Sequence, residues 1–438
     1  MNYINEFLNY LNKSKTAFHA CKNIEDILLK NNFIKLAENE KWNLEKGNKY
    51  FVSRNNASIL AFTIPSNLDE ISYNITAAHL DSPTFKLKPN FKMDEKRFNR
   101  LNVEVYGGPI FNTWMDRGLD IAGRVFVKEN GKIKPVLFSF DRPVALIPNL
   151  PIHYNRGVNK GVELNPQIDL VPLIGDKENI DVNLLDEIAK KLNVNKNDIL
   201  SYDLFLSLLE RGYLAGINND FIMAPQIDNL ECSFGLTKAL LESKNNKSIN
   251  VMALFDSEEI GSSTRDGAGS TLLKDIVERI SFNLGLNQEE HKIALANSFI
   301  VSADNAQGYH PNYPSKYDPT NAVILNSGIV IKNAARGSYT TDALSSAYFK
   351  EICVNAKAKY QDNTNRSDVP GGSTLGAISL GLVSIPSVDI GLAQLAMHSS
   401  FETAGAKDLD DLIKAIKEFY NCHLTNNKDG ELSYELCK

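Results

Sequence analysis

Apolar residues near the start of the chain recur at intervals of three and four, which predicts an amphipathic helix within residues 4–11. A second helix is predicted from Thr16 to Lys30. Residues 49–64 contain two apolar runs separated by Asn55-Asn56, a pair suited to a tight turn, and therefore predict a β-hairpin.

Farther along, short apolar runs alternate with longer stretches of helical periodicity. The predicted strands are Ile71–Ala78, Asn250–Asp256, Phe299–Ala303 and Ser384–Ile390. The predicted helices are Asn229–Leu241, Ser270–Arg279, Asp342–Lys357 and Asp408–Tyr420. This alternation predicts an α/β fold in which a mixed central sheet is covered by helices on both faces.

The alternation is interrupted between residues 91 and 219. This segment holds Gly107-Gly108-Pro109, a β-rich run over Gly123–Lys128 and a helical stretch over Asp181–Leu192. We therefore predict an inserted β-rich domain at 91–219, with residues 1–90 and 220–438 forming one discontinuous domain.

Composition narrows the functional classes. A length of 438 residues is enough for two domains, and 43% hydrophobic with 23% charged residues is typical of a soluble globular protein. The net charge of −6 argues against a basic nucleic-acid-binding face. The apolar stretch Gly376–His398 is interrupted by Pro386 and Asp389, so we expect a buried strand there and no membrane span.

The cysteines predict neither a disulfide framework nor a thiolate metal site. They are odd in number, scattered and contain no CxxC pair: Cys21, Cys232, Cys353, Cys422 and Cys437. Residues 1–15 lack the pattern of a signal peptide. We expect the protein to be cytoplasmic.

Polar residues gather where the predicted strands end. Three strands run directly into His79, into the segment Asp256–Glu259 and into Asp304, and a fourth leads by a short loop to His398. Asp228 precedes a predicted helix. Because ligands bind at the carboxyl ends of strands in open α/β sheets, these side chains should converge.

Each of these residues also has a purely structural interpretation. Asp228 alone would most often be a helix N-cap, and a lone His79 or His398 a satisfied imidazole. The pair Glu258-Glu259 would usually be solvated. Two adjacent carboxylates directly after a buried apolar run repel each other, however, and need cations or protons to remain there.

The set of side chains also suits two metal ions. Two histidines and three carboxylates give each ion three protein ligands if one carboxylate bridges, and the remaining carboxylate can carry protons. Mixed imidazole and carboxylate ligands favour Zn²⁺, with Mn²⁺ or Co²⁺ as substitutes. Asp81, two residues after His79, could fix the tautomer of the ring.

Several other common catalytic motifs are absent from the sequence. The chain has no HExxH, GxSxG or Walker A sequence. The segment Gly371–Gly376 is glycine-rich but lacks the lysine of a phosphate loop, and we interpret it as a tight loop near the active site.

Several short segments, which include the clustered residues, resemble motifs of the M18 family of metallo-aminopeptidases. This family includes aspartyl aminopeptidase and its bacterial relatives. The matching segments run in family order from about residue 16 to 420: Ala77–Pro83, Tyr106–Pro109, Trp114–Arg117, Asp228–Leu230, Asp256–Ser262, His310–Tyr313 and Gln394–Ser399. The resemblance implies a zinc-exopeptidase type of fold and removal of the N-terminal residue from peptides with a free N-terminus.

The resemblance also implies roles for the clustered residues. Asp228 would bridge two zinc ions. His79 and Asp304 would complete the coordination of one ion, and Glu259 and His398 that of the other. Glu258 would be the general base that takes a proton from water and delivers it to the leaving amine.

Outside this cluster, the resemblance assigns residues to substrate binding and assembly. Residues 91–219 would be a dimerisation domain within a homo-oligomer, typically a dodecamer built from dimers. His153 would reach a neighbouring subunit's active site, His310 would contact substrate, and Lys332 would pair with an acidic first residue. The segments Ala334–Tyr339 and Ser399–Glu402 differ from the eukaryotic aspartyl members, so neutral first residues stay open.

Two other functions remain as alternatives. A two-metal amidohydrolase acting on small acylated substrates would need the same ligands, although the inserted domain argues against it. A catalytically inactive shell or cargo-binding particle would keep the fold, although Glu258 and all five expected ligands are present.

Overall fold

The computed structural model describes residues 3–68, 70–93, 95–178, 182–244, 247–372, 374–379, 381–428 and 430–436. Among them, nine strands form the central sheet, in the order β1 (Ile34–Leu36), β2 (Lys49–Arg54), β3 (Ser58–Thr63), β13 (Ile249–Phe255), β4 (Tyr73–His79), β14 (Phe299–Ala303), β18 (Ser387–Gly391), β16 (Ile329–Lys332) and β17 (Tyr360–Asn363). Strands β13, β4, β14 and β18 run parallel, so their carboxyl ends lie at one edge of the sheet.

Successive side chains along the strands of the central sheet pack into two separate hydrophobic cores, one on each face of the sheet. On β2, Phe51 packs into the core that contains helices α1 (Ile4–Lys13), α2 (Ala17–Lys30), α4 (Ile227–Glu242), α7 (Ala343–Ala356) and α9 (Asp408–Asn421). Its neighbours Tyr50 and Val52 face the core that contains α5 (Leu272–Asn283) and α6 (Gln288–Ala296). Because side chains alternate across a strand, both faces of the sheet are covered. The predicted mixed α/β fold is confirmed.

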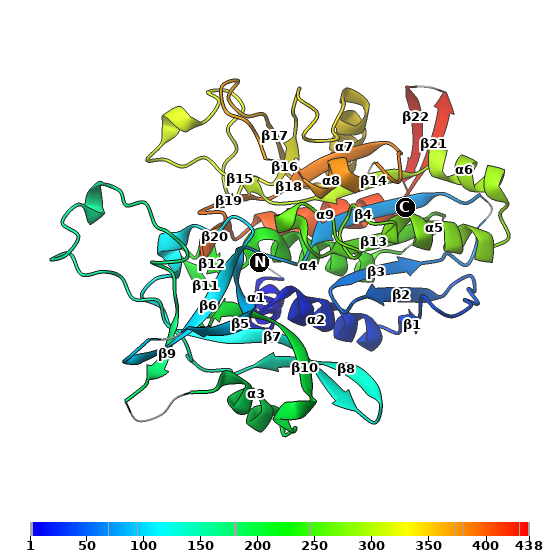
Figure 1. Ribbon diagram of the computed structural model, residues 1–438. Coiled ribbons are helices and arrows are strands. Elements are labelled where there is room, and N and C mark those ends of the chain that lie inside the picture. Colours follow the sequence, from blue (N-terminus) through cyan, green and yellow to red (C-terminus); the bar gives the residue numbers. More distant parts are fainter. Residues whose placement is uncertain are drawn as a thin grey trace.

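A second sheet is built from a separate part of the chain. Among the described residues its antiparallel strands are, in order, β8 (Lys132–Ser139), β7 (Leu119–Glu129), β10 (Ile199–Leu208), β5 (Thr84–Met93), β6 (Phe98–Tyr106) and β9 (Leu173–Asp176). Figure 1 shows this sheet and α3 (Leu184–Leu192) together on one side of the molecule. Helix α2 contacts both β3 and β7, so it lies between the two sheets.

A third, small sheet borders the same edge as the ends of the parallel strands. Its order is β11 (Tyr213–Ala215), β12 (Phe221–Ala224), β20 (Glu402–Gly405), β19 (Ala393–Leu395) and β15 (Ala306–Gln307). A hairpin of β21 (Cys422–Lys428) and β22 (Glu431–Leu436) ends the described chain, and a short helix α8 (Leu375–Ser379) precedes β18.

Most predicted elements occur within a few residues of their predicted bounds. The strand expected from Ser384 begins only at Ser387, directly after Pro386, which has no N–H to donate to a ladder. In the hairpin, Asn55 and Asn56 both adopt positive φ, as a tight turn requires. The start of the helical stretch predicted at Asp181 lies outside the described residues, and α3 begins at Leu184.

Within Gly376–His398, α8 ends and β18 and β19 follow, so a buried strand replaces any continuous apolar helix. Across the described residues, no helix has both the length and the apolar character needed to cross a bilayer.

Candidate metal centre

The strand ends bring five distant side chains to one place. His79 is the last residue of β4, Asp304 follows β14, and His398 follows β19. Glu259 lies in a short 3-10 turn, Glu258–Ile260, which follows β13. Asp228 lies in the first turn of α4, where its backbone angles are not helical.

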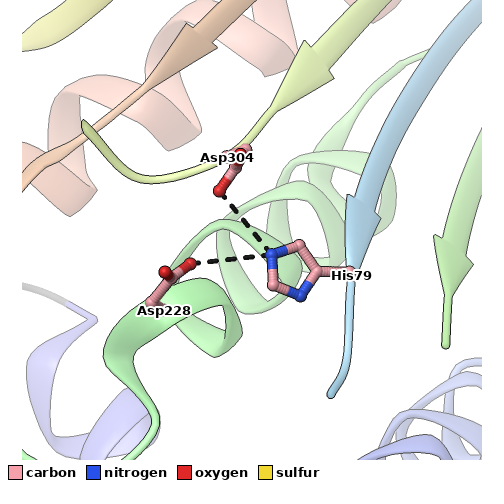
Figure 2. A group of neighbouring side chains, drawn as sticks. All are labelled: His79, Asp228 and Asp304. Carbon is pink, nitrogen blue, oxygen red and sulfur yellow. Dashed lines mark ion pairs between the residues drawn. The ribbon is translucent and has the colours of Figure 1, made fainter. Parts of the chain in front are cut away.

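One group of three surrounds the ring of His79. Its Nε2 lies 3.6 Å from Oδ1 of Asp228 and 3.6 Å from Oδ1 of Asp304. Figure 2 shows both carboxylates pointing toward this nitrogen, from the start of α4 and from the end of β14. All three side chains are almost completely buried.

A second group of three shares Asp228. Nε2 of His398 lies 3.4 Å from Oδ2 of Asp228 and 3.5 Å from Oε1 of Glu259. Asp228 therefore presents Oδ1 to His79 and Oδ2 to His398. A carboxylate that offers one oxygen to each of two groups has the arrangement of a bridging ligand.

The spacing and the unsatisfied atoms of this cluster fit metal ions. Tetrahedral ligands at about 2.0–2.1 Å from an ion lie roughly 3.3–3.4 Å apart, close to the 3.4–3.6 Å between donor atoms here. Among the described residues, Oδ1 of Asp228 and Oε1 of Glu259 are buried without a hydrogen-bond partner. Buried polar atoms are normally satisfied, so these two oxygens are available to a cation bound between the side chains.

The histidine rings are oriented for the same purpose. Nδ1 of His79 lies 3.0 Å from the carbonyl oxygen of Asp81, and Nδ1 of His398 lies 3.0 Å from the carbonyl oxygen of Gly108. With a proton on each Nδ1, both Nε2 atoms are left as acceptors that face the carboxylates. Metal-binding histidines usually have such an arrangement.

Electrostatics also favour positive charge at this place. Burial and neighbouring carboxylates raise the pKa of Glu258 to about 7 and that of Glu259 well above its ordinary value. Burial alone would lower the pKa of His398, but Asp228 and Glu259 outweigh it and raise this pKa to about 9. The cluster therefore holds protons tightly when no other cation is available.

Asp228 is not a helix N-cap. The residue before the helix is Gln226, and among the described residues no backbone N–H group donates to Oδ1 of Asp228. The structural interpretation that the sequence left open for Asp228 therefore does not hold.

Asp81 contacts both the His79 ring and the turn that carries the glutamates. The carbonyl oxygen of Asp81 accepts from the His79 ring, whereas its carboxylate lies 3.5 Å from that ring. The carboxylate instead accepts from the backbone N–H groups of Glu258 and Glu259, each at 3.1 Å, and from the hydroxyl of Tyr106 at 2.9 Å. Asp81 thus holds the turn that carries both glutamates.

Glu402 contacts two of the clustered residues and is not among the predicted site residues. Its Oε2 accepts from the backbone N–H of Asp228 at 3.0 Å, and its Oε1 accepts from that of His398 at 2.7 Å. It is buried on β20. The only sequence signal is an acidic residue four positions after His398.

The end of β6 supplies a further set of contacts to the cluster. Gly107 has a φ of +69°, and a Cβ atom there would lie 3.1 Å from Cβ of Glu259. The backbone N–H of Ile110 donates to the carbonyl of His398 at 2.9 Å. The segment Tyr106–Ile110 therefore joins the second sheet to Glu259 and His398, a role that its sequence alone does not indicate.

Beside the cluster is a recess of about 160 Å³. Its remaining lining includes Lys332, Tyr339, Asn363, Asn365, Gly372, Thr374 and Met397. Nζ of Lys332 is buried and lies 2.9 Å from the carbonyl of Asn305 and 3.4 Å from Oδ2 of Asp304. The loop Gly371–Gly376 therefore lies beside the site, as predicted, although Ser373 is outside the described residues.

The two other predicted substrate residues do not line this recess within the chain. His153 is exposed in the long connection between β8 and β9. His310 lies beyond β15, where its ring packs at a tilt against Tyr313 with ring centroids 4.9 Å apart.

The site combines imidazoles and carboxylates at the carboxyl edge of an α/β sheet with a neighbouring glutamate whose pKa is raised. This combination is typical of a metal-dependent hydrolase. Comparison with known proteins agrees with this class. The sequence model of the family described as aminopeptidase I zinc metalloprotease (M18) matches residues 10–420. This chain belongs to the M18 family, and it is a metallo-aminopeptidase.

Relatives match over nearly their whole length. A probable M18 family aminopeptidase 2 of Clostridium novyi is 45% identical over 426 residues, which cover 96% of this chain and 98% of that protein. Aspartyl aminopeptidase 1 of Schizosaccharomyces pombe is 36% identical over 448 residues, which cover 95% and 94%. The structure of the S. cerevisiae mApe1 dodecamer is similar, with a TM-score of 0.82 at 28% identity, over 96% of this chain and 97% of that one.

Proposed function

We propose that the enzyme removes the N-terminal residue of peptides with two zinc ions that share Asp228. The observation that carries this proposal is that the two carboxylate oxygens of Asp228 face different histidines. Its Oδ1 lies near His79, and its Oδ2 lies near His398. His79 and Asp304 would hold one ion, and Glu259 and His398 the other. Mn²⁺ or Co²⁺ could replace zinc, because both accept nitrogen and oxygen ligands.

When bound, the ions supply Lewis acidity and lower the pKa of water. Glu258 would act as the general base. Burial raises its pKa to about 7, and its side chain lines the recess. A carboxylate with a pKa near neutrality can accept a proton from water and return it to the departing amine.

The recess suits the end of a peptide better than its middle. Its volume of about 160 Å³ is small, and its lining includes Asp228, Glu258, Glu259 and Asp304. These carboxylates would attract the α-ammonium group of a free N-terminus.

Lys332 supports a preference for Asp or Glu as the first residue. Its ammonium group lines the recess, and a relative in Schizosaccharomyces pombe is named an aspartyl aminopeptidase. The same ammonium group already pairs with Asp304. Lys332→Met should therefore lower kcat/KM for aspartyl substrates more than for alanyl substrates. An equal loss of kcat/KM for aspartyl and alanyl substrates would mean that Lys332 only pairs with Asp304 and does not select the first residue.

We further propose a homo-oligomer, built from dimers into a dodecamer, in which residues 91–219 form contacts between subunits. Support comes from the dodecameric structure of a relative and from exposed apolar side chains in this segment, including Ile152, Tyr154 and Ile168. His153, beside Ile152, would then reach a neighbouring active site, and His310 would contact substrate.

The cytoplasm is the proposed compartment. Among the described cysteines, Cys21, Cys232 and Cys353 are buried and outside any disulfide, which suits a reducing environment.

A panel of chromogenic substrates tests the proposed activity. Release of free N-terminal residues should require metal, stop with a chelator and return with zinc. Hydrolysis of N-acylated compounds alone would favour an amidohydrolase, and no hydrolysis of any substrate by zinc-loaded protein would favour an inactive shell.

A further inference from the structure

Glu402 lies beside the second group of the cluster and hydrogen-bonds to two of its members, Asp228 and His398. Its two carboxylate oxygens accept from different residues, Oε2 from the N–H of Asp228 and Oε1 from the N–H of His398. Its side chain is buried, and β20 pairs on both sides, with β12 and β19. A buried carboxylate on a paired strand is a rigid support.

Both backbone segments need such a support. His398 has a φ of +66°, a left-handed conformation that a residue with a Cβ adopts only at a cost of about 1 kcal/mol or more. Asp228 lies in the first turn of α4 with φ −76° and ψ 109°, outside the helical range. Neither conformation follows from the flanking secondary structure, so tertiary hydrogen bonds have to fix them.

Glu402 supplies one such bond to each segment, and other groups supply the rest. The carbonyl of Asp228 accepts from the hydroxyl of Ser82 at 2.8 Å. The carbonyl of His398 accepts from the N–H of Ile110 at 2.9 Å. Among the described residues, Glu402 hydrogen-bonds to the backbone of both segments, so it constrains the distance between them.

We propose that Glu402 is a positioning residue that holds Asp228 and His398 at the separation required by the ion bound between them. This inference rests on the proposed two-ion function. It adds that the affinity of the ion at Asp228, Glu259 and His398 depends on a carboxylate that binds no metal.

Substitution by glutamine isolates this role. Glutamine has nearly the same shape, but it offers one acceptor oxygen and an NH₂ group. In Glu402→Gln, one of the two backbone N–H groups would therefore face another donor. Glu402→Asp keeps both carboxyl oxygens, but it is too short to reach both N–H groups.

Glu231 provides a matched control. It is completely buried on α4, three residues after Asp228. Its side chain accepts one long hydrogen bond, from Nδ2 of Asn305 at 3.4 Å, and no described hydrogen bond joins it to Asp228 or His398. Glu231→Gln thus removes a neighbouring buried carboxylate without touching either segment.

The experiment is a zinc titration of the full-length protein and the three variants against a competing chromogenic chelator, with kcat, KM and metal-free thermal unfolding measured in parallel. We expect two ions per wild-type chain. In Glu402→Gln one of them should bind about 10- to 100-fold more weakly, with a lower kcat and a smaller change in KM. Glu402→Asp should be intermediate, and Glu231→Gln should match the wild type.

Wild-type affinity for both ions in folded Glu402→Gln would overturn the inference. If Glu402→Gln does not fold, wild-type affinity in Glu402→Asp would overturn it. Failure of both to fold, while Glu231→Gln folds, would assign Glu402 to folding and overturn it as well. A wild-type chain that binds no zinc would instead contradict the proposed function.

Discussion

The two halves of the cluster are built from different kinds of structure. His79 and Asp304 end or follow parallel strands in the middle of the central sheet, and their side chains are 1% and 11% exposed. Glu259 and His398 lie in a short turn and a loop, and the His398 side chain is 32% exposed. The central sheet positions the first half directly, whereas the second half also depends on hydrogen bonds from segments of the other two sheets.

These hydrogen bonds connect the second half to the rest of the molecule. Asp81 and Tyr106 hold the turn of Glu259, while Gly108 orients the His398 ring. Tyr106 is the last residue of β6, in the second sheet, and Gly108 follows two residues later. Changes in that sheet should therefore affect the His398 half more than the His79 half, which Tyr106 reaches only through Asp81.

The largest expected effect comes from the residue that both halves share. Asp228→Ala removes an oxygen from each group, so both ions should bind poorly and activity should fall to background. Zinc content by elemental analysis and turnover measure this. The side chain has an unsatisfied oxygen, so circular dichroism should show a normal fold. Two tightly held ions in this variant would contradict the shared role.

Glu258→Gln separates proton transfer from metal binding. Both halves should keep their ions, while kcat falls by about 10²- to 10⁴-fold because the base is lost. The measurements are steady-state kinetics and zinc content of the same sample. Near-normal turnover would refute the assignment of Glu258 as the base.

Removing one histidine from each half compares them directly. His398→Ala should leave one ion per chain that resists chelation as well as the tighter wild-type ion does. His79→Ala should lose that tighter ion, because it removes a ligand from the half that the sheet holds. Graded chelation followed by elemental analysis gives the order of release. Identical release profiles for the two variants would contradict the claim that the His79 half holds its ion more tightly than the His398 half.

A smaller effect is expected from the second sheet. Tyr106→Phe deletes the hydroxyl that donates to Asp81, and loss of one such bond, about 1 kcal/mol, should lower kcat about fivefold. Tyr202→Phe is the matched control, since its hydroxyl bonds the carbonyl of Lys88 in the same sheet, away from the cluster. Equal losses in both variants would indicate a general effect on the sheet.

The sequence predicts the first half better than the second, for a physical reason. Buried parallel strands are continuous apolar runs, so the bounds of β14 are predicted correctly and Asp304 follows directly from them. The strands that hold Glu402 and precede His398 are only four and three residues long, with no periodicity to detect. His398 was predicted from an earlier strand and the loop after it, and Glu402 was missed.

Backbone contacts explain most of what was missed. Glu402 acts on N–H groups, and Gly108 acts through its carbonyl on a residue 290 positions away. Neither contact depends on a distinctive side-chain pattern. The pairing of Lys332 with Asp304 was missed for a similar reason, because the register that joins β16 to β18 is not apparent in either run.

Diffraction from crystals of the zinc-loaded protein, recorded at the zinc absorption edge, tests the central claim most directly. The account predicts two anomalous peaks per chain, one beside Nε2 of His79 and one beside Nε2 of His398, each next to a different oxygen of Asp228. A single peak, or two peaks that do not share Asp228, would contradict it.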